Sequence, residues 1–285
     1  MYKILKKEVL APTISLFDIE APMVARSAQA GQFVILRTID DGERIPLTIA
    51  DFDREKGTIT CVFQEVGKTT TELAKFNVGD CLKDFVGPLG EPSHIENFGR
   101  VVVVGGGVGV APIHPIARAL KEAGNEVIGI IGARSGDLLF WEDKLRDACT
   151  ELRVTTDDGS YVRQGFVTDV LKEVIEEKGD VALCVAIGPL PMMRAVCNMT
   201  KDYNLKTVVS LNSIMVDGTG MCGCCRVTVG GQTKFACVDG PEFDGHQVDF
   251  AEMARRSVIY KEQEQVAMEH YRQGHQCTCG CGGGK

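Results

Sequence analysis

The sequence has no long apolar segment and no excess of basic residues. No run approaches the roughly 20 apolar residues that a membrane-crossing helix needs, so we expect no membrane span. Lysine and arginine number 31 against 39 aspartate and glutamate residues, which gives a formal net charge of −8. This balance provides no basic footprint for nucleic acid. We therefore expect neither an integral membrane protein nor a nucleic-acid-binding protein.

The N-terminus also lacks the features of a secretory signal. Residues 1–8 are partly basic, and neither an apolar core nor a cleavage site of small residues follows them. We therefore expect a cytoplasmic protein, in which 12 cysteines indicate metal binding or redox chemistry rather than disulfides. Five scattered cysteines are expected to fill the core. These are Cys61, Cys81, Cys149, Cys184 and Cys197.

The chain is long enough for two moderate domains and a small module. Residues 1–98 alternate short β-type runs with turn signals, which predicts an antiparallel barrel or sandwich. Residues 99–211 alternate continuous apolar runs with helical segments, which predicts a doubly wound, parallel α/β sheet. Residues 212–248 are rich in cysteine and glycine and indicate a metal-organised module. In the final segment, 249–285, we expect a helix followed by a glycine-rich tail.

The cysteine-rich module carries the most specific motif. Asp217, Cys222, Cys225 and Cys237 follow the spacing D-x4-C-x2-C-x11-C. This is close to the ligand spacing of a plant-type [2Fe-2S] ferredoxin, except that the first position offers a carboxylate oxygen in place of a thiolate. Three glycines within the run suit a loop around a compact cluster, because they allow positive φ and close backbone approach. We predict these four residues as the cluster ligands.

Two alternatives stay open at this module. In the first, Asp217 caps a turn and Cys224 is the remaining ligand. Cys224 and Cys225 are adjacent, however, and neighbouring residues rarely point into one cluster, whereas Asp217 preserves the four-residue gap. In the second, the cysteines bind structural zinc, which would be colourless and redox-silent.

The tail contains a separate run of cysteines. Cys277, Cys279 and Cys281 are spaced C-x-C-x-C among glycines. Such a run can bind zinc or another soft metal, and the alternative is a mobile thiol tail without metal. The sequence leaves both possibilities open.

Two turns containing glycine follow predicted strands of the α/β region. Gly105–Pro112 follows an apolar run at 101–104, and Gly188–Met193 follows the run at 181–187. Missing β-carbons let phosphate oxygens approach backbone N–H groups at a helix start. A tight turn without ligand is the alternative for the first motif alone. Two turns at one carboxyl edge predict a nucleotide-binding crevice.

Two further motifs lie in the β-rich region. Arg44 precedes Thr48 by four residues, and Pro46 between them restricts the strand to an edge or a bulge. The segment 67–71, Gly-Lys-Thr-Thr-Thr, then opens a helix. A guanidinium, helix-start amides and hydroxyls are the groups that bind a diphosphate. The alternative is that the threonines merely cap the helix.

Together these motifs resemble the ferredoxin-NADP reductase superfamily. The resemblance covers residues 1 to about 265. It rests on Arg44–Thr48, Val66–Thr70, Gly87–Gly90, Gly105–Pro112, Thr156–Ser160, Gly188–Met193 and Cys237–Pro241. The cysteine module after the nucleotide region resembles the electron-transfer subunit of heteromeric dihydroorotate dehydrogenase. It resembles more closely the small subunit of NADH-dependent ferredoxin:NADP oxidoreductases, a group that includes sulfide dehydrogenase subunits.

The resemblance implies an FAD-binding antiparallel β-barrel, an NAD-binding α/β domain and a [2Fe-2S] module. It implies that NADH passes a hydride to FAD near Thr48, taken as the catalytic residue, and that FAD passes single electrons to the cluster. The implied FAD-binding residues are Arg44, Pro46, Leu47, Thr48, Gly67, Lys68, Thr69, Thr70 and Thr71. The implied NAD(H)-binding residues are Gly106, Gly107, Val108, Gly109, Ala111, Pro112, Arg134, Asp158, Gly188, Pro189, Met192 and Met193.

The resemblance also implies a partner. This would be a large subunit that carries FAD and [4Fe-4S] clusters and resembles the glutamate synthase small subunit. The complex would link NAD(H), NADP(H) and ferredoxin by flavin-based electron bifurcation, with the cluster module near Met221 facing the partner. Dihydroorotate dehydrogenase subunits have cysteine where this chain has Asp217, so the aspartate favours the ferredoxin:NADP branch. The dihydroorotate dehydrogenase electron-transfer subunit is the alternative.

Overall fold

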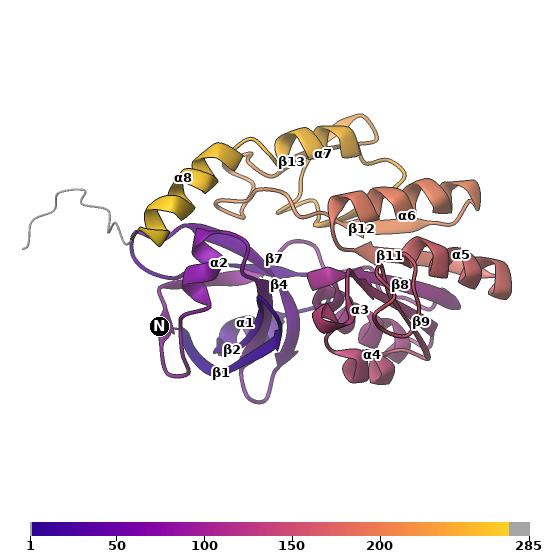
Figure 1. Cartoon of the computed structure of the whole chain (residues 1–285), viewed down its shortest axis with the longest axis horizontal. Helices are drawn as coiled ribbons and strands as arrows, with labels where there is room; N and C mark the ends of the chain where they lie inside the picture. The colour runs from indigo at the N-terminus through magenta and orange to yellow at the C-terminus, as the bar shows by residue number, and fades with distance from the viewer. Residues whose placement is uncertain (1, 274–285) are drawn as a thin grey trace, which may run out of the picture.

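The computed structural model describes residues 2–273. A β-barrel and an α/β sheet lie next to each other, and the C-terminal segment that carries α7 and α8 crosses above both (Figure 1). The predicted tail cysteines, Cys277, Cys279 and Cys281, lie outside the described residues.

The first part of the chain forms an antiparallel barrel. Its strands run in the order β6-β1-β2-β5-β4-β3-β7, and the two end strands are consecutive in the chain, so the barrel is nearly closed. This confirms the expected barrel. The strands are β1 (Tyr2–Ala11), β2 (Ile14–Glu20), β3 (Phe33–Arg37), β4 (Arg44–Asp53), β5 (Thr58–Gln64), β6 (Cys81–Leu82) and β7 (Asp84–Leu89). Two short helices interrupt them, α1 (Pro22–Ser27) and α2 (Lys68–Leu73).

The position of Pro46 in the barrel shows how a proline fits an internal strand. β4 lies between β5 and β3 in the sheet, so it is not an edge strand as a whole. Its pairing with β3 covers residues 44–48, whereas its pairing with β5 begins only at Ile49. Pro46 therefore lies where one side of the strand has no ladder, and the missing N–H leaves no carbonyl without a partner there.

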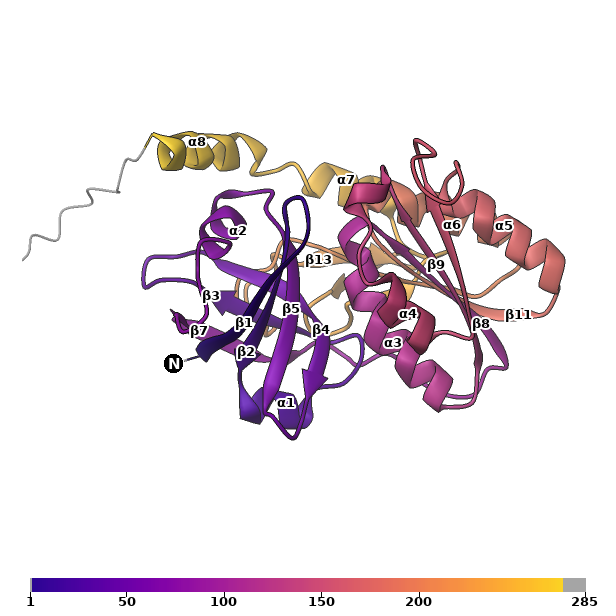
Figure 2. The ribbon, with the colours of Figure 1, turned by 60° about the horizontal axis from the view of Figure 1, so that its bottom comes forward.

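The second part forms the expected doubly wound sheet. Its strand order is β10-β9-β8-β11-β12-β15, parallel except for β15. Helices α3 and α4 pack on one face and α5 and α6 on the other (Figure 2). The strands are β8 (Arg100–Gly106), β9 (Glu126–Ala133), β10 (Glu151–Thr156), β11 (Val181–Ile187), β12 (Thr207–Ser210) and β15 (Glu242–Asp244). The helices are η1 (Gly107–Gly109), α3 (Val110–Glu122), η2 (Gly136–Leu138), α4 (Glu142–Ala148), α5 (Val167–Lys178) and α6 (Leu190–Asp202).

The cysteine-rich segment does not fold apart from the sheet. A hairpin of β13 (Arg226–Val229) and β14 (Gln232–Phe235) follows the cysteine loop, and β15 then joins the α/β sheet beside β12. Where one helix was expected at the start of the final segment, 249–285, the chain forms two, α7 (Phe250–Arg256) and α8 (Lys261–Arg272). No helix within residues 2–273 is long and apolar enough to cross a membrane.

Two continuous apolar cores join the parts of the molecule. In one, Leu16 and Val62 of the barrel pack with Ile113 of α3 and Leu145 of α4. In the other, Phe33 of the barrel packs with sheet residues, α5, α6 and the cysteine-rich segment. A large apolar interface restricts relative domain motion. The barrel, sheet and cysteine loop are therefore held in a fixed arrangement.

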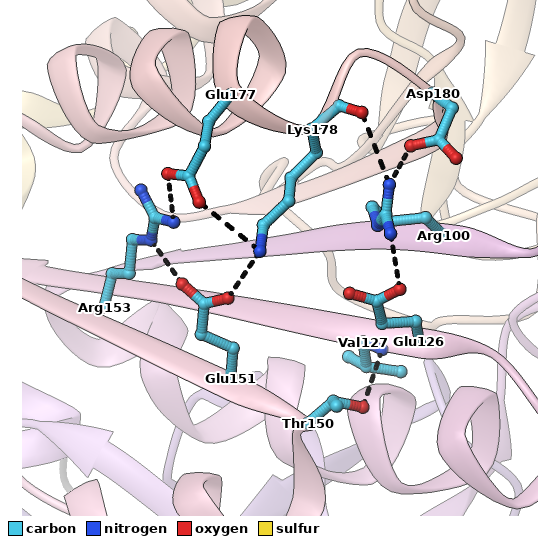
Figure 3. A network of polar contacts seen from close by, with 9 residues as sticks. All are labelled: Arg100, Glu126, Val127, Thr150, Glu151, Arg153, Glu177, Lys178 and Asp180. Atoms are coloured by element: carbon cyan, nitrogen blue, oxygen red, sulfur yellow. Dashed lines mark hydrogen bonds and ion pairs between the residues drawn. The ribbon is translucent and has the colours of Figure 1, made fainter.

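The amino edge of the α/β sheet carries a network of ion pairs (Figure 3). Arg100 pairs with Glu126 at 2.7 Å and also with Asp180. Arg153 pairs with Glu151 and Glu177 at 2.6 and 2.7 Å, and Lys178 contacts the same two carboxylates. The charges at this edge have partners within the fold. The ligand-binding edge of a parallel sheet is the opposite, carboxyl edge.

Candidate functional site

The cysteine loop brings two of its predicted ligands together. Cys225 and Cys237 are both buried, and their sulfur atoms lie 3.2 Å apart. Burial raises the pKa of Cys237 to about 12. A bound iron would supply the positive charge that a thiolate needs at this buried position. The burial of the two side chains and the short distance between their sulfur atoms fit the inner side of a metal centre.

The other two predicted ligands stand nearer the surface. Cys222 is exposed, and the carboxylate of Asp217 lies beside it. Within the described residues, no three cysteine, histidine, aspartate or glutamate side chains form a group that could hold a metal ion. A [2Fe-2S] cluster spreads its four ligands over two irons. Its ligands therefore need not meet around one ion.

Asp217 holds the turn at the start of this loop. Its Oδ1 accepts the Thr219 N–H at 2.9 Å, and its Oδ2 accepts the Cys222 N–H at 2.8 Å. These bonds hold the pKa of the Asp217 carboxyl below its usual value, and the bond from the Thr219 N–H has the largest effect. This is the geometry expected in the first alternative, in which Asp217 caps a turn and Cys224 is the remaining ligand. An ionised carboxylate has about four acceptor positions, so capping leaves oxygen lone pairs for a metal.

The backbone of the loop requires glycine. Gly218, Gly220 and Gly223 have φ of 77°, 82° and 67°, in the left-handed region that other residues rarely adopt. A β-carbon on Gly218 would lie 2.5 Å from Ile35 of β3. The loop therefore packs directly against a barrel strand.

Arg44, predicted to bind FAD, also contacts this loop. Its Nε donates to the Val216 carbonyl at 2.8 Å, and its Nη2 lies 3.4 Å from the Asp217 carbonyl. The first residue of β4 is thus at the boundary between the barrel and the cysteine loop. Thr48, the predicted catalytic residue, lies four positions along the same strand, is half-buried and pairs with Phe33 of β3.

The structure brings the two FAD motifs together. Thr69 Oγ1 donates to Glu43 Oε2 at 2.6 Å, which places the first turn of α2 beside the start of β4. Thr70 Oγ1 accepts the Gly67 N–H at 3.1 Å and so caps the helix. Helix capping was the alternative role for the threonines at 69–71. A β-carbon on Gly67 would meet nothing within 4 Å. This open backbone, on the segment that Thr69 joins to the start of β4, is consistent with a diphosphate.

The two nucleotide turns interlock at the carboxyl edge of the sheet. Ile187 at the end of β11 pairs with Gly105 at the end of β8. A β-carbon on Gly109 would lie 2.2 Å from the Ile187 carbonyl oxygen, and one on Gly106 would lie 2.2 Å from Met192 Sδ. At Gly109 the obstacle is backbone, so only glycine permits this approach there. Gly107 between them faces open space, and Ala111 and Pro112 follow in the first turn of α3.

The loops after β9 and β10 adjoin this edge. The Asp158 N–H donates to the Arg134 carbonyl at 3.1 Å, so the two predicted residues are neighbours. The Asp158 carboxylate accepts both the hydroxyl and the N–H of Ser160, at 2.6 and 2.9 Å. These bonds lower the pKa of the Asp158 carboxyl, and the bond from the Ser160 hydroxyl has the largest effect. This carboxylate is therefore occupied in shaping its own loop.

A charge cluster at the domain junction was missed by the sequence analysis. Asp51 of β4 accepts from Arg118 of α3 at 2.9 Å, and Lys144 of α4 and His114 of α3 lie 3.4 and 3.9 Å from it. Burial alone would raise the pKa of Asp51, but Arg118 and the other two groups outweigh it and hold that pKa below its usual value. Burial lowers the pKa of His114. No motif marks these residues, because three separate segments supply them.

Sequence families match two parts of the chain. Residues 212–249 match the family described as the iron-sulfur cluster binding domain of dihydroorotate dehydrogenase B. Residues 103–198 match the oxidoreductase NAD-binding domain. These regions contain the cysteine loop and the interlocked glycine turns.

Whole-chain comparisons extend the match. A Thermotoga maritima protein named as a homolog of the dihydroorotate dehydrogenase B (NAD(+)) electron transfer subunit is 48% identical, over 94% of this chain and 95% of its own length. The chain belongs to the dihydroorotate dehydrogenase B electron-transfer-subunit family. A Clostridium beijerinckii protein, an uncharacterized protein in the adh 3′ region, is 51% identical over 100% of both chains.

A solved structure is also similar to this chain over nearly its whole length. The structure described as that of the NADH-dependent reduced ferredoxin-NADP oxidoreductase, in work on flavin-based electron bifurcation, is 47% identical to this chain. The TM-score is 0.91, with 95% of this chain and 98% of that chain covered. These matches confirm the inferred resemblance, the fold and the expected cofactors, which are FAD, NAD(H) and a [2Fe-2S] cluster. The protein is thus an oxidoreductase subunit of a ferredoxin-NADP reductase-like system.

Proposed function

We propose that this chain is the small subunit of an NADH-dependent ferredoxin:NADP+ oxidoreductase that bifurcates electrons. The observation that carries the proposal is the contact of the Asp217 loop with the barrel. Arg44 at the start of the FAD motif donates to the carbonyl that precedes Asp217, and Gly218 packs on Ile35 of β3. Cluster and flavin sites that share a boundary suit transfer of single electrons between them. The similar bifurcating structure supports the same reading.

The interlocked turns are assigned to NAD(H). The backbone of 106–109 and the start of α3 present N–H groups for the pyrophosphate. The Gly188–Met193 turn forms the other wall, with Pro189 exposed and Met193 buried beneath it. The loops that carry Arg134 and Asp158 are assigned to the far side of the nucleotide, where Asp158 acts by shaping its loop through the bonds from Ser160. The close approach of Gly109 to the Ile187 carbonyl sets the distance between the Gly106–Gly109 turn and the Gly188–Met193 turn.

The barrel residues are assigned to FAD. The diphosphate is assigned to the first turn of α2, from Lys68 to Thr71, and to the part of the Arg44 guanidinium that does not donate to the Val216 and Asp217 carbonyls. Pro46, Leu47 and Thr48 are assigned to the ring system. When bound, FAD exchanges a hydride with nicotinamide and single electrons with an iron–sulfur centre. Thr48 is the last residue of the Arg44–Thr48 motif and directly precedes the buried Ile49. The proposed domains remain 1–98, 99–211, 212–248 and 249–285.

The proposed cluster ligands are Asp217, Cys222, Cys225 and Cys237. Cys225 and Cys237 form the buried side of the site, and Asp217 and Cys222 form the side toward the surface. Met221, 87% exposed, projects next to Cys222. We assign this face to a larger partner subunit with FAD and [4Fe-4S] clusters, through which ferredoxin and NADP(H) would react, in the cytoplasm.

The electron-transfer subunit of a dihydroorotate dehydrogenase is the second candidate. The family matched at 212–249 and the name of the Thermotoga maritima relative favour it. The two candidates share FAD, NAD(H) and cluster chemistry and differ in the partner.

Anaerobic purification from the native host, with identification of the co-purifying subunit and counts of flavin, iron and sulfide, tests the proposal. A large subunit with flavin and [4Fe-4S] clusters is expected. A partner that contains FMN and oxidises dihydroorotate would replace the proposal with the second candidate. A colourless zinc protein would overturn both.

A further inference from the structure

Arginines from separate elements donate to carbonyl groups of the proposed cluster loop. Arg256 at the end of α7 donates from Nη2 to the Cys224 carbonyl at 2.9 Å, across 32 positions in the chain. Arg44 donates to the Val216 carbonyl at the other end of the loop. Arg226 lies 3.3 Å from the Gly223 carbonyl. The loop is thus held at both ends by guanidinium groups.

The Arg256 contact comes from helix α7, which is distant in sequence from the loop and is itself anchored in the core. Phe250 and Met253 of α7 are buried in the same core as Cys225 and Cys237. Asp249 caps the helix by accepting the Glu252 N–H at 2.8 Å. The helix is therefore anchored beside the cysteines. Its last residue reaches the loop in a partly buried contact, whereas the Arg226 contact is local and exposed.

The carbonyl that Arg256 contacts belongs to the residue between two proposed ligands. Gly223 and Cys224 separate Cys222 from Cys225, so a bond to the Cys224 carbonyl restrains the backbone that carries both ligands. The guanidinium also places a positive charge beside the loop that would hold the cluster, and partial burial reduces the screening of that charge. A cluster gains one negative charge on reduction. Nearby charge and backbone order therefore tune its reduction potential.

We propose that Arg256 is a positioning residue that fixes the cluster loop through the Cys224 carbonyl and raises the reduction potential of the [2Fe-2S] cluster. The inference rests on the proposed function, since it requires the cluster. Arg256 touches neither substrate nor proposed ligand side chain. It acts through the backbone and through its charge.

The test is a potentiometric titration of the anaerobically purified holoprotein, with the reduced cluster followed by EPR spectroscopy. Arg256→Gln should lower the reduced-to-oxidised ratio at the wild-type midpoint about tenfold, which is about 59 mV for one electron. Arg256→Lys keeps the charge and should stay closer to wild type than the glutamine variant. Arg255→Gln removes the same charge from the neighbouring, exposed position of α7 and should leave the potential unchanged.

Two results would overturn the inference. One is an Arg256→Gln protein with full iron and sulfide content and the wild-type potential. The other is an equal shift in Arg255→Gln, which would show a general charge effect. If Arg256→Gln loses its cluster, the Arg256→Lys variant provides the test. The inference stands if Arg256→Lys retains the cluster with a potential near wild type. It fails if Arg256→Lys loses the cluster or shifts its potential. A wild-type protein without iron would instead refute the proposed function itself.

Discussion

The sulfur atoms of Cys225 and Cys237 lie 3.2 Å apart in the core where the barrel meets the α/β sheet. The hairpin of β13 and β14 produces this approach by folding the chain back after Cys225. Cys224, although adjacent to Cys225, is only half-buried. The pair therefore marks the buried side of the proposed cluster and separates the roles of the two neighbouring cysteines.

This separation predicts different outcomes for two substitutions at the loop. Asp217→Cys should retain a [2Fe-2S] centre with a changed potential, because a thiolate replaces the proposed oxygen ligand. Cys224→Ala should change little, since its backbone carbonyl remains for Arg256. Iron content, EPR spectra and redox titration provide the measurement. Loss of the cluster in Cys224→Ala, with Asp217→Ala unaffected, would reverse the ligand assignment.

The interlocked turns predict a specific loss in Gly109→Ala. The added methyl group would lie 2.2 Å from the Ile187 carbonyl oxygen, and backbone must move to accept it. We expect at least a tenfold weaker affinity for NADH, about 1.4 kcal/mol, with flavin and iron contents unchanged. The matched control is Gly231→Asn in the β13–β14 hairpin, where φ is 75° and a β-carbon meets nothing within 4 Å. Equal NADH affinity in Gly109→Ala and wild type would contradict the assigned crevice.

The charge cluster at the domain junction predicts a stability effect. Asp51→Asn leaves Arg118 and Lys144 facing a neutral group, and we expect a loss of about 1–3 kcal/mol, reduced from the fully buried case by partial exposure. Thermal or denaturant unfolding of the holoprotein measures it. Asp40→Asn, at a carboxylate that is 77% exposed beside Lys83, should leave the midpoint unchanged. Equal effects of the two substitutions would show that the junction contributes no more stability than an exposed ion pair.

Glu242 predicts a pH dependence of stability. Burial raises the pKa of its carboxyl above the usual 4.5, although Ser93 donates to it at 2.6 Å. The native state therefore holds the proton more firmly than the unfolded chain. Its contribution to stability is complete below 4.5 and is lost as the pH rises through the native pKa.

The variant Glu242→Gln removes this titration and can still accept the Ser93 hydroxyl. Its melting temperature should decline less than that of wild type as the pH is raised from 4.5. The measurement is a series of thermal unfolding curves at stepped pH for both proteins. Parallel curves would show that Glu242 does not titrate differently in the native state.

The elements that sequence predicted well are those with a strong local pattern. The strands β8 to β12 read as continuous apolar runs because helices cover both faces. The runs at 101–104 and 181–187 agree with β8 and β11 within a few residues. In β1, by contrast, only Ile4 and Ala11 are buried. Its exposed lysines and glutamate hide the alternation, so the sequence analysis did not predict that strand.

The contacts between elements could not be read from local pattern. The spacing of Asp217, Cys222 and Cys225 indicated a cluster loop, but nothing in it indicated that Arg44 would reach the Val216 carbonyl. Such contacts depend on how the barrel, sheet and loop pack. The same holds for β15, three residues long, which joins the sheet through its pairing with β12.

The central claim is that electrons from NADH pass through FAD to a [2Fe-2S] cluster within this chain. The most direct test is an anaerobic titration of the purified holoprotein with NADH, followed by visible absorption and EPR spectroscopy together. The account predicts that the flavin absorption bleaches and that the EPR signal of a reduced [2Fe-2S] cluster appears in the same titration. A flavin that NADH does not reduce, or a protein without that EPR signal after chemical reduction, would contradict it.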